Sequence, residues 1–532
     1  MPTTWINSFV ALSLDRQKKC IRPRRGTTCV FCTKRGLQCD VAPDQKPALP
    51  QGYAPLADPK GVALHASSAA IPDHALSREL IDLFFIHVHF AFPNMFHMPS
   101  FKAAFQDGTI PRVLFFAVIG LSARFSGHQS LSHINPWHRG RPYAREAEKL
   151  LDLHDTSIVT IQACMLLAAN FIADGEAMTE CVYLTIACRM AMLIDLPNLK
   201  VNSRVEQVVN RRVWWSLVTT DTWNSSSVSL PRAIQIRHDV PLPISEQDFI
   251  NLDINEPAEH IASPMTPFSP TSWPSPSLLA RFISLNTLLY EVNRLNARIA
   301  AEKVAEGQAH EAIRELAATL DAWLTDLPLQ LRYTEESMAF WGSQGSGPTF
   351  VNMHMNYHHI GQLLFYSSLG ASLEVGSDSP LCEQTIGLAT RCKQHAADLC
   401  DLIWTAKQRP QTDIMHSLVG HDLVTSSTVQ IHTLLFSLDD EEIAMARSRL
   451  ERNFEMITDL HKYWPIVSVT ISKLQKFHNA CLRYKDATFH LDRWMLQFIL
   501  EFSQPIQERS EEMLHRGDNE EVFDQLRNLI DV

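Results

Sequence analysis

The chain has 532 residues, of which 45% are hydrophobic and 20% are charged. This composition is typical of a globular protein and excludes general disorder. Eleven cysteines are too sparse for a disulfide scaffold, and the first residues do not show a secretory signal, so we expect an intracellular protein. The longest apolar run, residues 157–173, contains Gln162 and Asn170, which favours a buried helix over a membrane span.

The charges are unevenly distributed along the chain. The net charge is −11, yet the segment from Arg16 to Cys39 holds eight basic residues and no acidic one. The rest of the chain therefore carries 39 of the 47 basic residues and all 58 acidic ones. A small basic module on an acidic body predicts that one end binds a polyanion, and a basic tail or import signal without a fold is the alternative.

Four cysteines lie within this basic segment: Cys20, Cys29, Cys32 and Cys39. The spacing Cys29-x2-Cys32 is that of a metal knuckle, because two intervening residues let both sulfurs reach one tetrahedral ion. A bound zinc ion would organise a segment that is too short and polar to fold alone. The alternatives are four free cysteines or a redox pair, and the absence of a strand–helix pattern disfavours the redox pair.

The run RQKKCIRPRRGTTCVFCTKRGLQCD resembles the fungal binuclear zinc cluster, in which six cysteines hold two zinc ions and a short helix enters the DNA major groove. The four cysteines match the third to sixth of that pattern. The resemblance implies zinc as cofactor, double-stranded DNA with CGG triplets as partner, and a nuclear protein. It departs at the first two cysteine positions, which hold Val10 and Ser13. Either the first exon of the gene model is wrong, or the module is degenerate and holds one zinc ion at most.

The basic residues of the module fall into two groups. In an intact cluster, those before Cys20 would face base edges and phosphates, and arginine or lysine can read guanine O6 and N7. Those after Cys20 are expected to contact phosphates. The first group is Arg16, Lys18 and Lys19, and the second is Arg22, Arg24, Arg25, Lys34 and Arg35.

Residues 41–75 are rich in Pro, Ala and Asp without sustained periodicity, which is typical of a linker. Helical periodicity follows and predicts a body that is mostly α. Ser77 opens a helix that ends before Pro93. Further helices are predicted over residues 113–124, 144–153, 158–173, 181–194 and 211–223.

Passages of the body resemble the fungal-specific transcription factor domain, also called the middle homology region. They include FPNMFHMPSF at 92–101, RRVWWSL at 211–217 with Asp221, and LHKYWP at 460–465. The resemblance covers about residues 76–470 and implies an all-α regulatory domain that responds to a metabolite or corepressor. Trp214 and Trp215 are predicted to lie in the hydrophobic core. Three interpretations are open for Arg211 and Arg212: they pair with acidic residues, they line a pocket, or they lie on a solvated face. We favour the solvated face.

Four further segments leave alternatives open. The Ser/Pro-rich stretch 256–277 is interpreted as a loop, with phosphorylation as the alternative. Apolar residues over 278–299 predict a buried helix, with a dimer seam as the alternative. His354, His358 and His359 are interpreted as structural histidines and not as metal ligands. The acidic segment 506–532 is either an activation segment or a final amphipathic helix.

The sequence thus predicts a partial zinc-cluster DNA-binding module at 1–40, a linker at 41–75, an α-helical regulatory domain at 76–505 and an acidic segment at 506–532. The predicted function is sequence-specific regulation of RNA polymerase II genes, of a metabolic or secondary-metabolite pathway. The rival is an interaction protein that has lost DNA binding. No catalytic residue is predicted, because nucleotide-binding, hydrolase and kinase signatures are missing from the sequence. The other expected partners are a second copy of the chain, a coactivator or corepressor, and a small-molecule effector. We do not expect the protein to bind a membrane.

Overall fold

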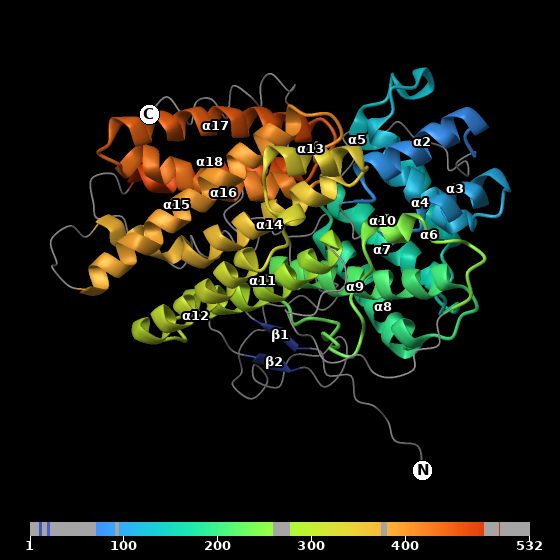
Figure 1. Cartoon of the computed structure of the whole chain (residues 1–532), viewed down its shortest axis with the longest axis horizontal. Coiled ribbons are helices and arrows are strands. Elements are labelled where there is room, and N and C mark those ends of the chain that lie inside the picture. Colours follow the sequence, from blue (N-terminus) through green and yellow to red (C-terminus); the bar gives the residue numbers. More distant parts are fainter. Residues whose placement is uncertain are drawn as a thin grey trace, which may run out of the picture. The chain divides into compact units, whose positions relative to one another are not determined.

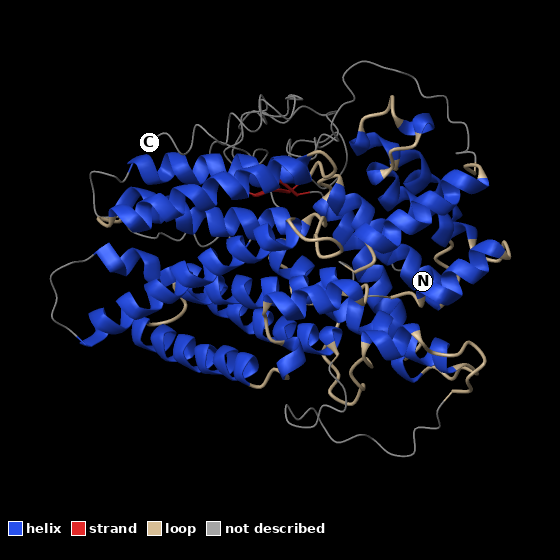
Figure 2. Cartoon of the chain, turned by 45° about the horizontal axis from the view of Figure 1, so that its top comes forward, coloured by secondary structure: helices blue, strands red, loops and turns tan. Residues whose placement is uncertain are grey.

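The computed structural model describes residues 10–12, 19–21, 71–90, 95–258, 277–373, 380–483 and 500. The chain divides into two compact units, residues 1–68 and 69–532. In the first unit, strands β1 (Val10–Leu12) and β2 (Lys19–Ile21) pair antiparallel, with Ala11 opposite Cys20. In the second unit the described residues form helices joined by loops, as Figure 2 shows, so the predicted mostly-α class is confirmed.

The helices of the second unit form two groups (Figure 1). The first group is α2 (His74–His87), α3 (Met98–Gln106), α4 (Arg112–Ser122), α5 (Pro136–Arg139), α6 (Arg141–Leu150), α7 (Ile158–Ala173), α8 (Ala177–Leu193), α9 (Arg204–Ser227) and α10 (Glu246–Ile250). The second group is α11 (Leu278–Ala300), α12 (Glu306–Thr325), α13 (Glu335–Ser343), α14 (Gly347–Phe365), α15 (Pro380–Lys407), α16 (Leu418–Phe436), α17 (Asp440–His461) and α18 (Val467–Arg483). Short 3-10 turns lie at Ala123–Phe125, Gln129–Leu131, Leu196–Asn198, Leu329–Leu331 and Tyr366–Leu373.

Helix α7 lies inside the first group, packed against α4, α6 and α8. It is apolar on all sides, and nearly every residue from Thr160 to Ala173 is buried. The Ser157 hydroxyl caps its start by accepting the Thr160 N–H. Its bounds are those predicted from the sequence. None of the described helices combines the length and the apolarity that crossing a bilayer requires.

Helix α9 differs from its prediction at both the start and the polar face. It begins at Arg204, seven residues before the predicted start, because Ser203 and Glu206 form a capping box. Trp214 and Trp215 are buried as predicted. The solvated face favoured for Arg211 and Arg212 is wrong, because both side chains are buried. The guanidinium of Arg212 lies 3.9 Å from the centre of the Phe249 ring and donates from Nη2 to the carbonyl of Ile244 (3.0 Å).

Helix α11 connects the two groups through its capped start. Both carboxylate oxygens of Glu246 on α10 accept backbone hydrogen bonds there, from Leu278 (3.0 Å) and Leu279 (3.0 Å). A carboxylate at a helix start satisfies orphan N–H groups and complements the helix dipole. The apolar face of α11 is buried against α9, α12 and α14, so the described helix packs inside the body as predicted.

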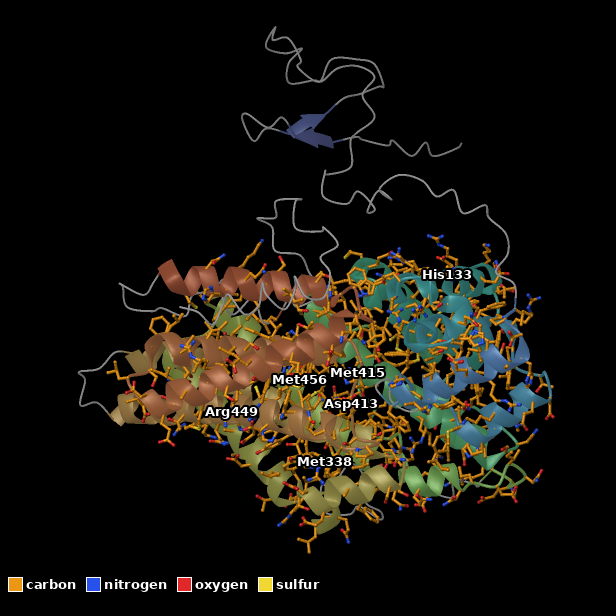
Figure 3. The ribbon with its side chains drawn as sticks, turned by 90° about the horizontal axis from the view of Figure 1, so that it is seen from above. His133, Met338, Asp413, Met415, Arg449 and Met456 are labelled. Atoms are coloured by element: carbon orange, nitrogen blue, oxygen red, sulfur yellow. The ribbon has the colours of Figure 1, made fainter. Side chains whose placement is uncertain are left out.

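Close helix packing in the second group depends on one glycine. A Cβ at Gly361 of α14 would lie 2.5 Å from the ring of His395 on α15. Such a distance is below any real contact, so the missing side chain of Gly361 leaves room for the buried His395 ring between α14 and α15. The segment between α15 and α16, where Figure 3 labels Asp413 and Met415, lies where the two groups meet. Its Met415 carbonyl accepts a hydrogen bond from the Trp464 indole (2.6 Å).

Candidate functional site

The predicted zinc and DNA-binding residues lie almost entirely outside the described part of the chain. Only Lys19 and Cys20 are described, and both belong to β2. Cys20 pairs with Ala11 and Ile21 pairs with Val10, one of the two positions where the resemblance expects a cysteine. The remaining ligands Cys29, Cys32 and Cys39 and the other basic residues fall outside the described residues, as do loop 259–276 and segment 506–532.

The four thiols fit one zinc ion and do not fit the two-ion cluster. Four cysteines supply a complete tetrahedral thiolate set for a single zinc. Two zinc ions need six cysteines in the pattern that the sequence resembles. Val10 and Ser13 cannot supply the missing thiolates.

A cavity whose surface is mostly apolar, with a few polar side chains, lies between the two helix groups of the body. Its empty space, with its solvent-open mouth, is about 670 Å³, although its interior has room for only a few water molecules. Its wall comes from α7, α8, α9, α11, α14 and the start of α16. The lining residues are Ile172, Glu180, Thr219, Thr220, Trp223, Asn224, Ser227, Phe282, Asn352, Met355, Asn356, His416, Ser417, Leu418 and Asp422.

Helical spacing brings these side chains to one wall. On α9, Thr220, Trp223, Asn224 and Ser227 recur three or four residues apart and so share one face of the helix. On α14 the corresponding positions are Asn352, Met355 and Asn356. The tertiary structure places these two faces opposite each other.

Several polar groups of the cavity are buried with their hydrogen-bonding capacity only partly used. The Asn356 amide donates to the Asn352 carbonyl (2.9 Å), while its Oδ1 has no partner among the described residues. The His416 ring lies 3.3 Å from the Asn352 side-chain oxygen. Burial raises the pKa of Glu180 to about 8, so this carboxyl is mainly protonated at neutral pH. A mostly apolar cavity with a few polar groups is suited to a small ligand that is mainly apolar and is oriented by those groups.

The most unusual group of the cavity is Asp422. Its side chain is fully buried, and neither of its oxygens accepts a hydrogen bond from the residues that the structure describes. Its Oδ1 lies 3.0 Å from Nδ1 of His359, but this contact does not have hydrogen-bond geometry. The His359 ring stacks on Trp223, with centroids 5.4 Å apart, and is in edge contact with His421 at 5.3 Å. Asp422 is therefore a buried carboxyl group without the hydrogen bonds from the described residues that usually stabilise one.

The three histidines predicted to be structural have three different environments. His354 is hydrogen-bonded through Nε2 to the Leu331 carbonyl (2.8 Å), and burial lowers its pKa to about 4. His358 faces His395, with their Nδ1 atoms 3.3 Å apart. His359 is not part of the cavity wall, but it contacts Asp422, which is. The sequence analysis missed this cluster because its members come from α14 and α16, about sixty residues apart.

Comparison with known proteins identifies the class of the helical body. Residues 81–323 match the fungal specific transcription factor domain. An uncharacterized transcriptional regulatory protein of Schizosaccharomyces pombe is 22% identical over 77% of this chain and 48% of its own length. The Zn(2)-C6 fungal-type transcription factor FTF1c of Fusarium oxysporum f. sp. lycopersici is 22% identical over 75% of this chain and 45% of its own length.

The helical body is therefore similar to that of transcriptional regulators, and residues 81–323 match the fungal specific transcription factor domain. The predicted resemblance of the body is confirmed. The chain spans about half the length of these curated relatives. The motif residues Trp214, Trp215, Arg212 and Asp221 are thus features of that domain's fold, since all four are buried inside it.

Proposed function

We propose that this protein is a sequence-specific, DNA-binding regulator of RNA polymerase II genes that acts in the nucleus. The observation that carries the proposal is the basic four-cysteine segment, residues 16–39, which precedes a fungal specific transcription factor domain in the same chain. Relatives named as Zn(2)-C6 transcription factors support this assignment. The helical body is proposed to control recruitment or repression, and no catalytic role is assigned to it.

In this proposal, Cys20, Cys29, Cys32 and Cys39 hold zinc as thiolates, and the surrounding cations offset the negative charge of the thiolate site. Bound zinc supplies the rigid framework of the segment. Arg16, Lys18 and Lys19 contact base edges and phosphates of a CGG-containing element. The remaining basic residues, Arg22, Arg24, Arg25, Lys34 and Arg35, contact phosphates.

The partners of the body follow from the family and the cavity. We propose a coactivator or corepressor and a small-molecule effector as partners, and a homodimer as the DNA-bound form. The target genes would belong to a metabolic pathway or a secondary-metabolite cluster.

DNA binding is tested with the double variant Lys18→Ala/Lys19→Ala, titrated onto a CGG-containing duplex at several salt concentrations. Each lost phosphate contact lowers the salt slope of log K by about 0.9, so the pair should lower it by up to about 2. The control Lys200→Ala/Lys303→Ala removes the same charge from exposed positions of the body. An unchanged slope in the first variant would remove these lysines from the interface.

Zinc binding is tested with Cys29→Ser/Cys32→Ser and metal analysis of the purified chain. The expected result is the loss of the zinc bound by this segment, while Cys181→Ser, a half-buried cysteine of α8, leaves the metal content unchanged. Equal zinc contents in all three proteins would refute the assignment. Sequencing the transcript upstream of Asp15 separates a gene-model error from real loss: two further cysteines would restore the six-thiolate cluster.

The rival function is an interaction protein that no longer binds DNA and acts through its helical body. The departure at Val10 and Ser13 favours it. A chain that neither retains zinc nor binds the duplex, but still changes transcription when tethered to a promoter, would establish this rival.

A further inference from the structure

The wall of the cavity between the two helix groups carries buried polar atoms that lack partners. Thr219 on α9, Asn356 on α14 and Asp422 on α16 all line this cavity, and each is at most 3% exposed. The Thr219 hydroxyl, Oδ1 of Asn356 and both Asp422 oxygens have no hydrogen-bond partner in the part of the chain that the structure describes. Unpaired buried polar atoms are rare in folded proteins, so we expect a bound molecule to pair with these.

The hydrogen bonds around Asn356 determine which of its side-chain atoms is unpaired. Its Nδ2 donates to the Asn352 carbonyl (2.9 Å) and to the Asn352 side-chain oxygen (3.3 Å), so the amide cannot be turned over without losing both bonds. The unpaired Oδ1 of Asn356 can only accept. The Asn352 side-chain oxygen also faces Nε2 of His416 at 3.3 Å, which makes this nitrogen the donor. Because burial lowers the pKa of His416 to about 4, its ring is neutral and its Nδ1 is a further acceptor.

This set of atoms defines the polar group of a ligand. Acceptors predominate, and Asn224, beside Glu180, adds one amide donor to the wall. A hydroxyl group donates one hydrogen bond and accepts up to two, so it can pair with both kinds of atom. A molecule without a donor would leave the oxygens of Asn356 and Asp422 unpaired, at the desolvation cost of each group.

The groups next to Asp422 favour a neutral ligand. Burial, with His359 and Lys473 as smaller contributions, lowers the pKa of His421, a ring nitrogen of which lies within 4.8 Å of an Asp422 oxygen. The Lys473 side chain is itself buried, so positive charge already lies near this part of the wall and opposes a cationic ligand. The carboxyl group of Asp422 and the carbonyl oxygen of Asn356 oppose an anionic one.

Most of the remaining wall is apolar and suits the body of such a ligand. The apolar lining residues are Ile172, Trp223, Phe282, Met355 and Leu418. The interior admits only the head of a ligand, and the open mouth leaves room for the rest. Because the wall comes from both helix groups, a bound molecule contacts both and should stabilise the folded body.

We propose that this cavity binds a small, neutral, mainly apolar hydroxyl compound, such as a phenol or an alcohol, whose hydroxyl groups pair with the unpaired atoms of Thr219, Asn356 and Asp422. The proposal rests on the small-molecule effector that the proposed function includes, and it assigns the chemical class and the binding residues of that effector. It does not depend on DNA binding or on zinc binding by the N-terminal segment.

The test is fluorine NMR of para-fluorophenol titrated with the full chain, in the absence of DNA. We expect saturable line broadening with one site per chain, and a rise in melting temperature with ligand concentration. Two matched probes define the class: para-fluoroanisole keeps the ring and the oxygen but lacks the donor, and para-fluorobenzoate carries a negative charge. Each should bind at least about tenfold more weakly than para-fluorophenol.

Variants of the wall locate the site. Thr220→Phe places a ring in the cavity and should abolish binding. Thr219→Val and Asn356→Leu each remove one unpaired polar atom and should weaken para-fluorophenol binding about threefold to tenfold. Thr222→Val makes the same change on α9 at a buried position outside the cavity wall and should leave binding unchanged.

Circular dichroism without ligand shows whether each variant is folded. Thr219→Val keeps the shape of the side chain and removes a hydroxyl that has no partner among the described residues, so it provides the measurement if another variant does not fold. The proposal is overturned if para-fluorophenol does not bind saturably, or if para-fluoroanisole or para-fluorobenzoate binds as tightly. It is equally overturned if the folded cavity variants bind like the parent chain. Because no DNA is present, these results are separate from those of the duplex titration, and either proposal can fail alone.

Discussion

The body of this protein contains buried carboxylates of two different kinds. In the first helix group, Asp221 accepts hydrogen bonds from the backbone N–H groups of Ala233 and Ile234 at 3.0–3.2 Å, and Glu246 accepts those of Leu278 and Leu279. Asp422, where the two helix groups meet, is equally buried and accepts none from the described residues.

The difference separates a structural role from a candidate functional one. A buried carboxylate that holds a helix end or a loop stabilises the fold through its bonds. A buried carboxylate without such bonds is costly, and proteins keep that cost mainly at binding sites. The tryptophan-rich motif of the matched domain therefore describes the architecture of the body, while the cavity beside α14 and α16 carries the candidate chemistry.

The largest expected effect is a loss of stability when a structural carboxylate is removed. Glu246→Ala leaves the N–H groups of Leu278 and Leu279 buried without acceptors and should lower the free energy of unfolding by about 2–5 kcal/mol. Urea unfolding followed by circular dichroism measures it. Glu256→Ala, at an exposed position, is the control and should change little. A similar small change in both variants would show that α11 does not depend on this cap.

The next effect is a loss of stability in acid that originates at the buried histidines. Burial lowers the pKa of His354 and of His416 to about 4 from the ordinary 6.5. Their neutral forms contribute stability that is complete above pH 6.5 and is lost as the pH falls towards 4, at up to about 1.4 kcal/mol per pH unit for each.

The variant His416→Gln should therefore lose less stability between pH 6.5 and 4.5 than the parent chain does. His133→Gln, at the exposed position labelled in Figure 3, is the matched control and should follow the parent chain. The test is to measure the free energy of unfolding of all three proteins across this pH range. Parallel curves for all three proteins would contradict the prediction.

A smaller effect tests how tightly the second helix group is packed. Gly361→Ala places a methyl group against the buried His395 ring and should destabilise the protein by about 1–3 kcal/mol. Gly387→Ala in α15 meets no atom within 4 Å and should stabilise it by about 0.5–1 kcal/mol. Thermal unfolding of the pair gives the two signs, and equal signs would mean that α14 and α15 can separate without cost.

The smallest expected effect on stability comes from changing Asp422, the carboxyl group without hydrogen bonds from the described residues. Asp422→Asn replaces a buried carboxyl group that accepts no hydrogen bond from the described residues, so the free energy of unfolding should change by less than about 1 kcal/mol or should increase. Chemical unfolding measures it. A loss of more than about 2 kcal/mol would instead show that the contact between His359 and Asp422 stabilises the fold.

Local signals of the sequence accounted for much of the helical body. The continuous apolar run and its Ser157 cap specified α7, and the tryptophan-rich stripe specified the buried part of α9. The early start of α9 was also readable, because Ser203 and Glu206 have capping-box spacing, but the prediction followed only the apolar pattern.

The amino-acid sequence alone determined the helical class, the separation of a basic cysteine segment from an acidic body, and the tryptophan core of α9, because periodicity, charge and spacing are local properties. Only the tertiary structure decided that Arg212 is buried against Phe249 and that His359 faces His421 and Asp422. Those environments arise from segments tens of residues apart, and chain distance gives no information about which helices pack together. The chemistry of the cavity is therefore a property of helix packing.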